Sequence, residues 1–181
     1  GIVPAPTITA VTPGSTSVTV TFTAPTNTGG SDITNYQYSA DGGTTWNALS
    51  PADPASPITV SGLTEGTTYN ISIRAVNSSG TGVASTTETF TTGDQPAAPT
   101  ISSIVEDDRK LTVAFATGQN GGSPLTNVEY STDGGTTWFA RSPASLFSPL
   151  VITKVSSDGT TSVVNGTSYS VKIRAVNTYG S

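Results

Sequence analysis

The chain contains no cysteine, no histidine and no methionine. Without cysteine it can form no disulfide and has no thiol nucleophile, and without histidine it lacks the imidazole base and the commonest ligand of zinc and copper. No serine or threonine stands at motif spacing from a suitable base, and no glycine-rich loop leads into a helix. We therefore expect a protein that is not an enzyme and binds no cofactor.

Charged residues are also scarce, at 10% of the chain, with seven Lys or Arg against twelve Asp or Glu. Nucleic acids are bound by clusters of Lys and Arg, so we expect no nucleic-acid partner. No apolar run approaches the roughly 18 residues of a membrane-spanning helix, so no membrane insertion is expected. Because the chain starts at Gly1 and contains no methionine, we expect it to be a piece of a longer protein.

The sequence repeats itself. The copies lie 92 residues apart at Trp46 and Trp138 but 100 apart at Tyr69 and Tyr169, so the second copy has about eight more residues after Trp138. This pattern predicts two tandem modules, residues 1–93 and 94–181. The matching segments are DGGTTW at 41–46 and 133–138, SVTVTF at 17–22 with KLTVAF at 110–115, and TTYNISIRAVN at 67–77 with TSYSVKIRAVN at 167–177.

Each copy alternates apolar and polar residues with a period of two, as at Val18, Val20 and Phe22. This period is typical of strands with one buried face, and helical spacing does not occur. Turn residues such as Gly29-Gly30 interrupt the strands every eight to twelve positions. The sequence therefore predicts an all-β fold of antiparallel sandwiches.

Both copies resemble the fibronectin type III module. The resemblance implies two tandem immunoglobulin-like β-sandwiches, with seven strands in the first. The copies depart from the family where Phe stands for the usual Trp at the end of the second strand, where Val163 replaces a leucine and where Val128 replaces an aromatic residue. The shared features are Pro6 and Pro99, Phe22 and Phe115, Gly29-Gly30 and Gly121-Gly122, Leu63 with Tyr69, and Ala75-Val76-Asn77 with Gly80.

The repeated DGGTTW has two interpretations. A carboxylate beside two glycines is half of a metal or sugar site, or it forms a hairpin turn that both modules need. Asp-Gly strongly favours a hairpin, because glycine adopts positive φ and Asp caps its own turn, so we interpret the motif as a turn. We expect Trp46 and Trp138 in the cores. The family strand order places Arg74 opposite Gln37 and Arg174 opposite Glu129, as surface pairs.

Two further sites can be drawn from the sequence. Three adjacent carboxylates, with one from a later loop, form a weak candidate for calcium; the alternative is a solvated acidic turn whose charge the following Arg109 and Lys110 offset. Three aromatic residues that do not fit a buried strand position form a candidate contact patch for a protein or carbohydrate surface. The calcium candidate is Glu106, Asp107, Asp108 and Asp158, and the patch is Phe139, Phe147 and Tyr179.

The second copy also differs from the first near its end. Copy one continues from AVNSSGTG into ASTTETFTT, whereas copy two stops at AVNTYGS, so we expect the second sandwich to lack its last strand. Either the chain was cut short or a neighbouring chain donates that strand. The additional residues of copy two should form a hairpin around Asp158-Gly159.

Tandem modules of this kind resemble spacer arrays in bacterial and phage surface proteins. The expected function is a non-enzymatic structural or adhesive spacer in a larger surface-exposed protein, next to other modules of the same parent chain. The alternatives are a virion decoration or fibre protein of a phage and a spacer in a secreted carbohydrate-active enzyme. The expected location is extracellular, on a cell surface or on a virion surface.

Overall fold

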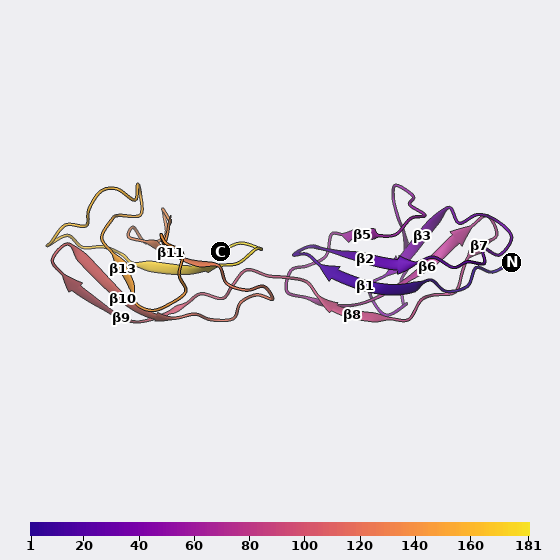
Figure 1. Ribbon diagram of the computed structural model, residues 1–181, viewed down its shortest axis with the longest axis horizontal. Coiled ribbons are helices and arrows are strands. Elements are labelled where there is room, and N and C mark those ends of the chain that lie inside the picture. The colour runs from indigo at the N-terminus through magenta and orange to yellow at the C-terminus, as the bar shows by residue number, and fades with distance from the viewer. The chain divides into compact units, whose positions relative to one another are not determined.

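The computed structural model describes residues 1–181, which form strands and loops without any helix (Figure 1). No helix is therefore available that could cross a membrane. The chain divides into two compact units, Gly1–Gly93 and Asp94–Ser181.

The first unit is built of two antiparallel sheets. One sheet has the order β1-β2-β5, and the other has the order β4-β3-β6-β7, with β8 pairing a separate part of β6. The unit has eight strands where seven were expected, because the two-residue β7 pairs with the end of β6. The strands are β1 (Thr7–Pro13), β2 (Ser17–Thr23), β3 (Asn35–Ser39), β4 (Asn47–Ala48), β5 (Ile58–Ser61), β6 (Thr68–Asn77), β7 (Gly80–Thr81) and β8 (Glu88–Thr91).

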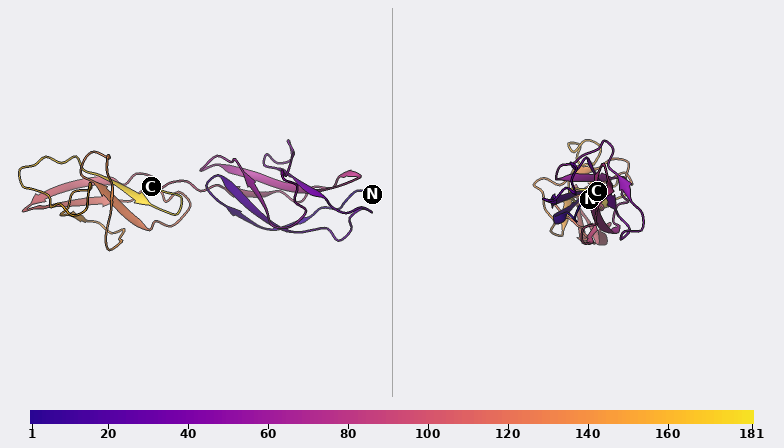
Figure 2. Two further views of the ribbon diagram at one scale, coloured as in Figure 1. Left: turned by 90° about the horizontal axis from the view of Figure 1, so that it is seen from above. Right: turned by 90° about the vertical axis from the view of Figure 1, so that its right-hand side faces the viewer.

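The core of the first unit lies between its two sheets, whose layers can be followed in Figure 2. Val18, Val20 and Phe22 alternate along β2 and are buried, while the residues between them face outward. Phe22 packs across the core against Tyr36 of β3, with ring centroids 4.6 Å apart. The period-two pattern of the sequence therefore corresponds to one buried face on each sheet.

The second unit repeats this plan with six strands. Its sheets have the orders β13-β10-β9 and β12-β11-β14, which correspond to β5-β2-β1 and β4-β3-β6 of the first unit. No strand corresponds to β8, so β14 pairs with β11 alone among the named strands. The strands are β9 (Thr100–Asp107), β10 (Lys110–Ala116), β11 (Asn127–Ser131), β12 (Phe139–Ala140), β13 (Leu150–Ile152) and β14 (Lys172–Val176).

The additional residues of the second unit form a hairpin with a longer loop than the sequence indicated. Lys154 and Ser162 form an antiparallel bridge, and the backbone N–H of Val155 donates to the carbonyl of Thr161 at 2.8 Å. The loop is therefore wider than the expected two-residue turn. Asp158 shapes it by accepting bonds from the backbone N–H groups of Thr160 and Thr161, both at 2.8 Å.

Candidate functional site

The DGGTTW segments are closed loops between paired strands. In the first unit the loop joins β3 to β4, which pair through Gln37 with Ala48 and Tyr38 with Asn47. Gly42 and Gly43 adopt φ angles of 74° and 93°, which glycine reaches without strain. The hairpin interpretation of this motif is confirmed.

In each DGGTTW loop the aspartate carboxylate is hydrogen-bonded by residues of the loop and of the strand before it. Asp41 accepts hydrogen bonds from the Ser39 hydroxyl at 2.7 Å, the Thr44 N–H at 3.0 Å, and the N–H and hydroxyl of Thr45 at 2.9 and 2.6 Å. The structure thus gives Asp41 a local role that requires no bound ion.

Asp133 is held in the same way in the second unit. The hydroxyl and N–H of Thr137 donate to it at 2.6 and 2.9 Å, and the Ser131 hydroxyl donates at 2.7 Å. These bonds favour the ionised form, and those from Thr137 contribute most. They lower the pKa of Asp133 to about 2, and equivalent bonds from Thr45 hold the pKa of Asp41 well below its usual range.

The two tryptophans lie outside the cores, contrary to the expectation from the sequence. Trp46 donates its indole N–H to the carbonyl of Gly43 at 3.2 Å and belongs to the loop. The guanidinium group of Arg74 lies over the face of the Trp46 ring, with its central carbon 4.2 Å from the ring centre. Trp138 stands in the same relation to Gly135 and to Arg174. A cation over the indole face replaces the apolar packing that was expected.

The predicted arginine pairs are confirmed. Arg74 donates from Nε to Oε1 of Gln37 at 2.8 Å, and Arg174 forms an ion pair from Nε to Oε2 of Glu129 at 2.6 Å. The strands align Gln37 with Arg74 and Glu129 with Arg174 directly opposite each other. Each guanidinium therefore links the DGGTTW loop to the neighbouring strand.

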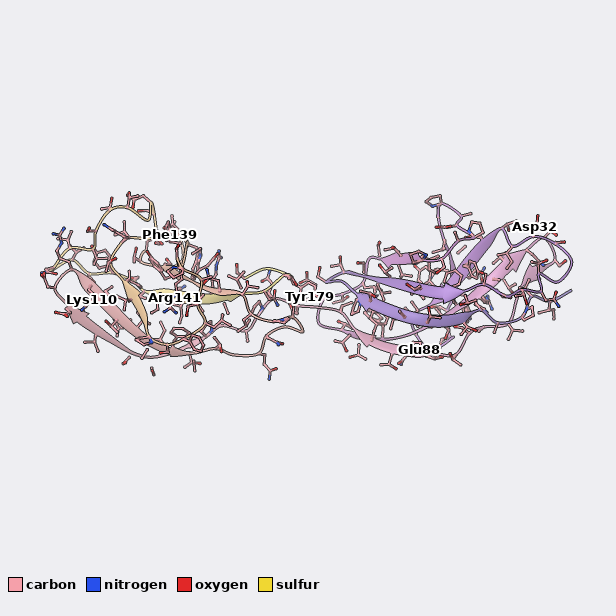
Figure 3. All side chains as sticks on the ribbon, in the orientation of Figure 1. Asp32, Glu88, Lys110, Phe139, Arg141 and Tyr179 are labelled. Atoms are coloured by element: carbon pink, nitrogen blue, oxygen red, sulfur yellow. The ribbon has the colours of Figure 1, made fainter.

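The candidate calcium residues have separate partners. Asp107 forms an ion pair with Lys110 at 2.9 Å, Asp108 accepts from the Asn165 amide at 2.8 Å, and Asp158 is bound within its own loop. Glu106 is exposed on β9. No group of three or more acidic side chains in the chain is arranged to hold a metal ion. Figure 3 shows Lys110 at the end of the hairpin that carries Asp107.

The three residues of the candidate contact patch have different surroundings. Phe139 packs against the core, with its ring centroid 5.9 Å from that of Tyr130. The ring also contacts Gly159, in the hairpin after β13. Phe147 is 81% exposed, in a loop that Arg141 holds by donating to the Phe147 carbonyl at 2.6 Å. Tyr179 is half-buried and lies apart from Phe139, at the end of the unit (Figure 3).

A cavity of about 370 Å³ lies in the second unit beside the part of the chain that leads into β14. It is lined by apolar side chains from both layers and by the acidic turn. Sequence reasoning did not identify this cavity; its signal was the absence of any counterpart to Phe90. The apolar lining residues are Ile104, Leu111, Val163, Tyr169 and Val171.

Comparison with known proteins places the first unit in a family. Residues 4–92 match the Fibronectin type III domain family. The chain is 32% identical over 130 residues to Neural cell adhesion molecule 1-B of Xenopus laevis, over 66% of this chain and 12% of the relative. It is 31% identical over 144 residues to Neural cell adhesion molecule 1 of Gallus gallus, over 74% and 13%. The chain thus spans only about an eighth of the curated relatives' length.

Two solved structures are similar to about half of the chain, with TM-scores below 0.5. Domains from titin align with a TM-score of 0.43 and 28% identity, over 50% of this chain and 32% of that one. The 6th fibronectin type III domain from human fibronectin type III domain containing protein 3 aligns with a TM-score of 0.39 and 22% identity, over 54% and 92%. The curated relatives are animal proteins and do not support the bacterial or phage resemblance. Residues 4–92 of this chain are a fibronectin type III domain, and the second unit repeats its strand order.

Proposed function

We propose that this chain is a non-enzymatic adhesive segment of a larger protein on the outside of an animal cell, in which two sandwich modules carry contacts and set spacing. The observation that carries the proposal is the similarity to neural cell adhesion molecules over 66–74% of the chain. Their names describe proteins of cell adhesion, and this chain corresponds to a small part of each.

The site geometry supports a scaffold role for the residues that the two units share. The carboxylates of Asp41 and Asp133 are bound inside their loops, and the arginines that cover Trp46 and Trp138 are bound to the neighbouring strand. These carboxylates and guanidinium groups stabilise the loops, and their hydrogen-bonding positions are already taken by neighbouring residues, so they are poorly suited to act as catalytic groups. Contacts with a partner would then be made by surfaces that differ between the units.

A bead assay tests the adhesive role. Beads coated with the folded chain should attach to cultured animal cells, or to one another, more than uncoated beads do. The matched control carries Tyr36→Asp and Val128→Asp, which place a charge in each core and unfold both units without changing most of the surface. Equal attachment of beads with the folded and the unfolded chain would contradict an adhesive role for the folded surface.

A further inference from the structure

Three asparagines of the chain begin the tripeptide Asn-X-Ser or Asn-X-Thr, in which X is not proline. In proteins that animal cells export, this tripeptide is the acceptor of N-linked glycans. The folded protein can carry such a glycan only where it leaves room for a sugar on the asparagine amide. The three are Asn70, with Ser72 two positions on, Asn77, with Ser79, and Asn165, with Thr167.

Asn77 lies inside the first unit and serves its fold. It is 5% exposed, its Nδ2 donates to the carbonyl of Thr28 at 2.8 Å, and its Oδ1 accepts from the N–H of Ser79 at 2.9 Å. Asn177, at the matching place in the second unit, is equally buried and also donates its amide to backbone carbonyls, although no Ser or Thr stands two positions after it. The fold therefore accounts for Asn77 and leaves no space there for a sugar.

Asn70 lies on the outer face of β6 with a free amide nitrogen. The residue is exposed, and its side chain has one hydrogen bond, which Oδ1 accepts from the Thr89 hydroxyl at 2.8 Å. In the second unit Ser170 occupies the same place. The backbone carbonyl of each residue accepts the N–H of the first glycine of a DGGTTW loop, at 3.1 Å for Asn70 and 2.9 Å for Ser170. The fold therefore does not require an asparagine at this position.

Asn165 stands in an exposed turn before β14. All residues from 164 to 168 are exposed, and a Cβ on Gly166 would have nothing within 4 Å, so the turn is surrounded by open space. Glu65 and Gly66 form the equivalent turn of the first unit and are also exposed, and both glycines have positive φ. The turn therefore lies at the surface in both units and forms without an asparagine.

Attachment of a sugar to Asn165 is compatible with the hydrogen bonds of its side chain. The reaction joins Nδ2 to C1 of the first sugar, breaks the bond between that carbon and the diphosphate of a lipid-linked oligosaccharide, and releases the lipid diphosphate and one amide proton. Oδ1 is unchanged and continues to accept the N–H of Arg109, now at 2.7 Å. Nδ2 keeps one hydrogen with which to donate to Asp108, now at 2.8 Å.

We propose that Asn70 and Asn165 are acceptor sites for N-linked glycans and that Asn77 is not. The assignment rests on the proposed function, because only a chain that animal cells export meets the oligosaccharide donor. Both acceptors stand where the two units differ, Asn70 against Ser170 and Asn165 against Glu65. Each unit then carries one glycan, the first on the outer face of β6 and the second at the turn before β14.

Secretion of the full chain from cultured animal cells, behind a cleavable signal peptide, tests the assignment. Peptide N-glycosidase in heavy-oxygen water converts each glycosylated asparagine to a labelled aspartate, which mass spectrometry of tryptic peptides locates. The label should appear at the two proposed acceptors and be absent at Asn77. A sample without the glycosidase corrects for spontaneous deamidation. Each of the three asparagines falls in a different peptide, because trypsin cleaves after Arg74, Lys154 and Lys172.

Two variants each remove one acceptor. Asn70→Gln keeps an exposed amide at the same place. Thr167→Ala removes the hydroxyl that the glycan transferase requires and leaves Asn165 with its hydrogen bonds; Thr167 is exposed, so the fold should not change. Each variant should lose one of the two glycans, visible as a single step in electrophoretic mobility, and the double variant should lose both. Thr167→Ser keeps the hydroxyl, is the matched control and should retain both glycans.

Three results would overturn the proposal: an unmodified Asn70 or Asn165 in the secreted chain, a glycan at Asn77, or equal mobility of Thr167→Ala and Thr167→Ser. The bead assay separates these sites from the adhesive role. If beads coated with the secreted chain attach to cells while the two acceptors are unmodified, the glycan sites are wrong and the adhesive role stands. If both acceptors are modified and the beads do not attach, the adhesive role is wrong and the glycan sites stand.

Discussion

The guanidinium carbon of Arg174 lies 4.3 Å from the centre of the Trp138 ring while its Nε is bound to Glu129 at 2.6 Å. One side chain thus joins the DGGTTW loop to β11. Arg74 repeats the arrangement over Trp46, with the neutral Gln37 in place of the carboxylate. The repeated hexapeptide is therefore half of a structural unit whose other half is the arginine of the IRAVN segment.

The two arginine arrangements predict the effect of Glu129→Gln. The substitution reproduces the neutral pair of the first unit and should lower the free energy of unfolding by less than about 1 kcal/mol, because the ion pair is partly exposed. Urea unfolding at low and high salt measures this difference, which should shrink as salt screens the ion pair. A loss of several kcal/mol would mean that the carboxylate does more than hold Arg174.

The coupling between Arg174 and Trp138 can be measured by a double-mutant cycle. Arg174→Ala, Trp138→Ala and the double variant should yield a coupling of about 0.5–1 kcal/mol, as expected for a cation over an indole near the surface. Chemical unfolding of the four proteins provides the measurement. Strictly additive losses would show that the stacking contributes nothing to stability.

Gly159 is predicted to resist replacement by alanine. A Cβ at this position would lie 1.8 Å from Cε2 of Phe139, and the residue has φ of 65°. Displacing the ring should cost about 1–3 kcal/mol beyond the backbone strain. The matched control is Gly166→Ala, at φ of 79° with nothing within 4 Å, which has the strain alone, about 1–2 kcal/mol. Equal losses in the free energy of unfolding for the two variants would show that the Phe139 ring does not contact Gly159.

The loop carboxylates predict a loss of stability in acid. Asp133 has a pKa of about 2 in the folded chain against about 3.9 when unfolded, so the unfolded state binds the proton first. Its contribution is complete above pH 4 and is lost as the pH falls from about 4 through 2. The thermal midpoint of Asp133→Asn should lie below that of the unchanged chain at pH 6, and the two midpoints should converge near pH 2. A constant gap between them would contradict this role.

Phe90 closes the first unit, so Phe90→Ala should be strongly destabilising. The ring is nearly fully buried against Tyr69, and its removal should cost about 3–5 kcal/mol in the free energy of unfolding. Thr89→Ala, on the same strand, loses one exposed hydrogen bond to Asn70 and should cost about 1 kcal/mol. Denaturant titration followed by circular dichroism compares the variants. Equal losses would refute the anchoring role of Phe90.

Much of the fold could be predicted because its signals are local. The alternation of apolar and polar residues along β2 and β10 predicts which of their side chains are buried. The Asp-Gly-Gly segments predict hairpins from three consecutive residues. The strand order of the resembled family was sufficient to pair Arg74 with Gln37 and Arg174 with Glu129.

The remainder depended on contacts that the sequence does not encode locally. Trp46 and Phe139 stand at the ends of the same kind of loop, where strands of two residues are too short for alternation to assign a face. Whether such a side chain enters the core depends on a distant segment: Arg74 covers Trp46, and Gly159 receives Phe139. The cavity beside Tyr169 was not predicted, because its lining residues come from segments far apart in the sequence, from Ile104 to Val171.

Amide hydrogen exchange of the free chain, resolved by NMR, tests most directly the claim that the two units share one plan and differ at one edge. Ile71 of β6 pairs with Glu88 of β8, whereas Val171 occupies the matching position without a strand beside it. The Ile71 and Tyr69 amides should be strongly protected, and the Val171 and Tyr169 amides should exchange at least about a hundredfold faster, because unpaired amides at an edge open without unfolding the unit. Equal protection of Val171 and Ile71, in a chain shown to be monomeric, would contradict the open edge.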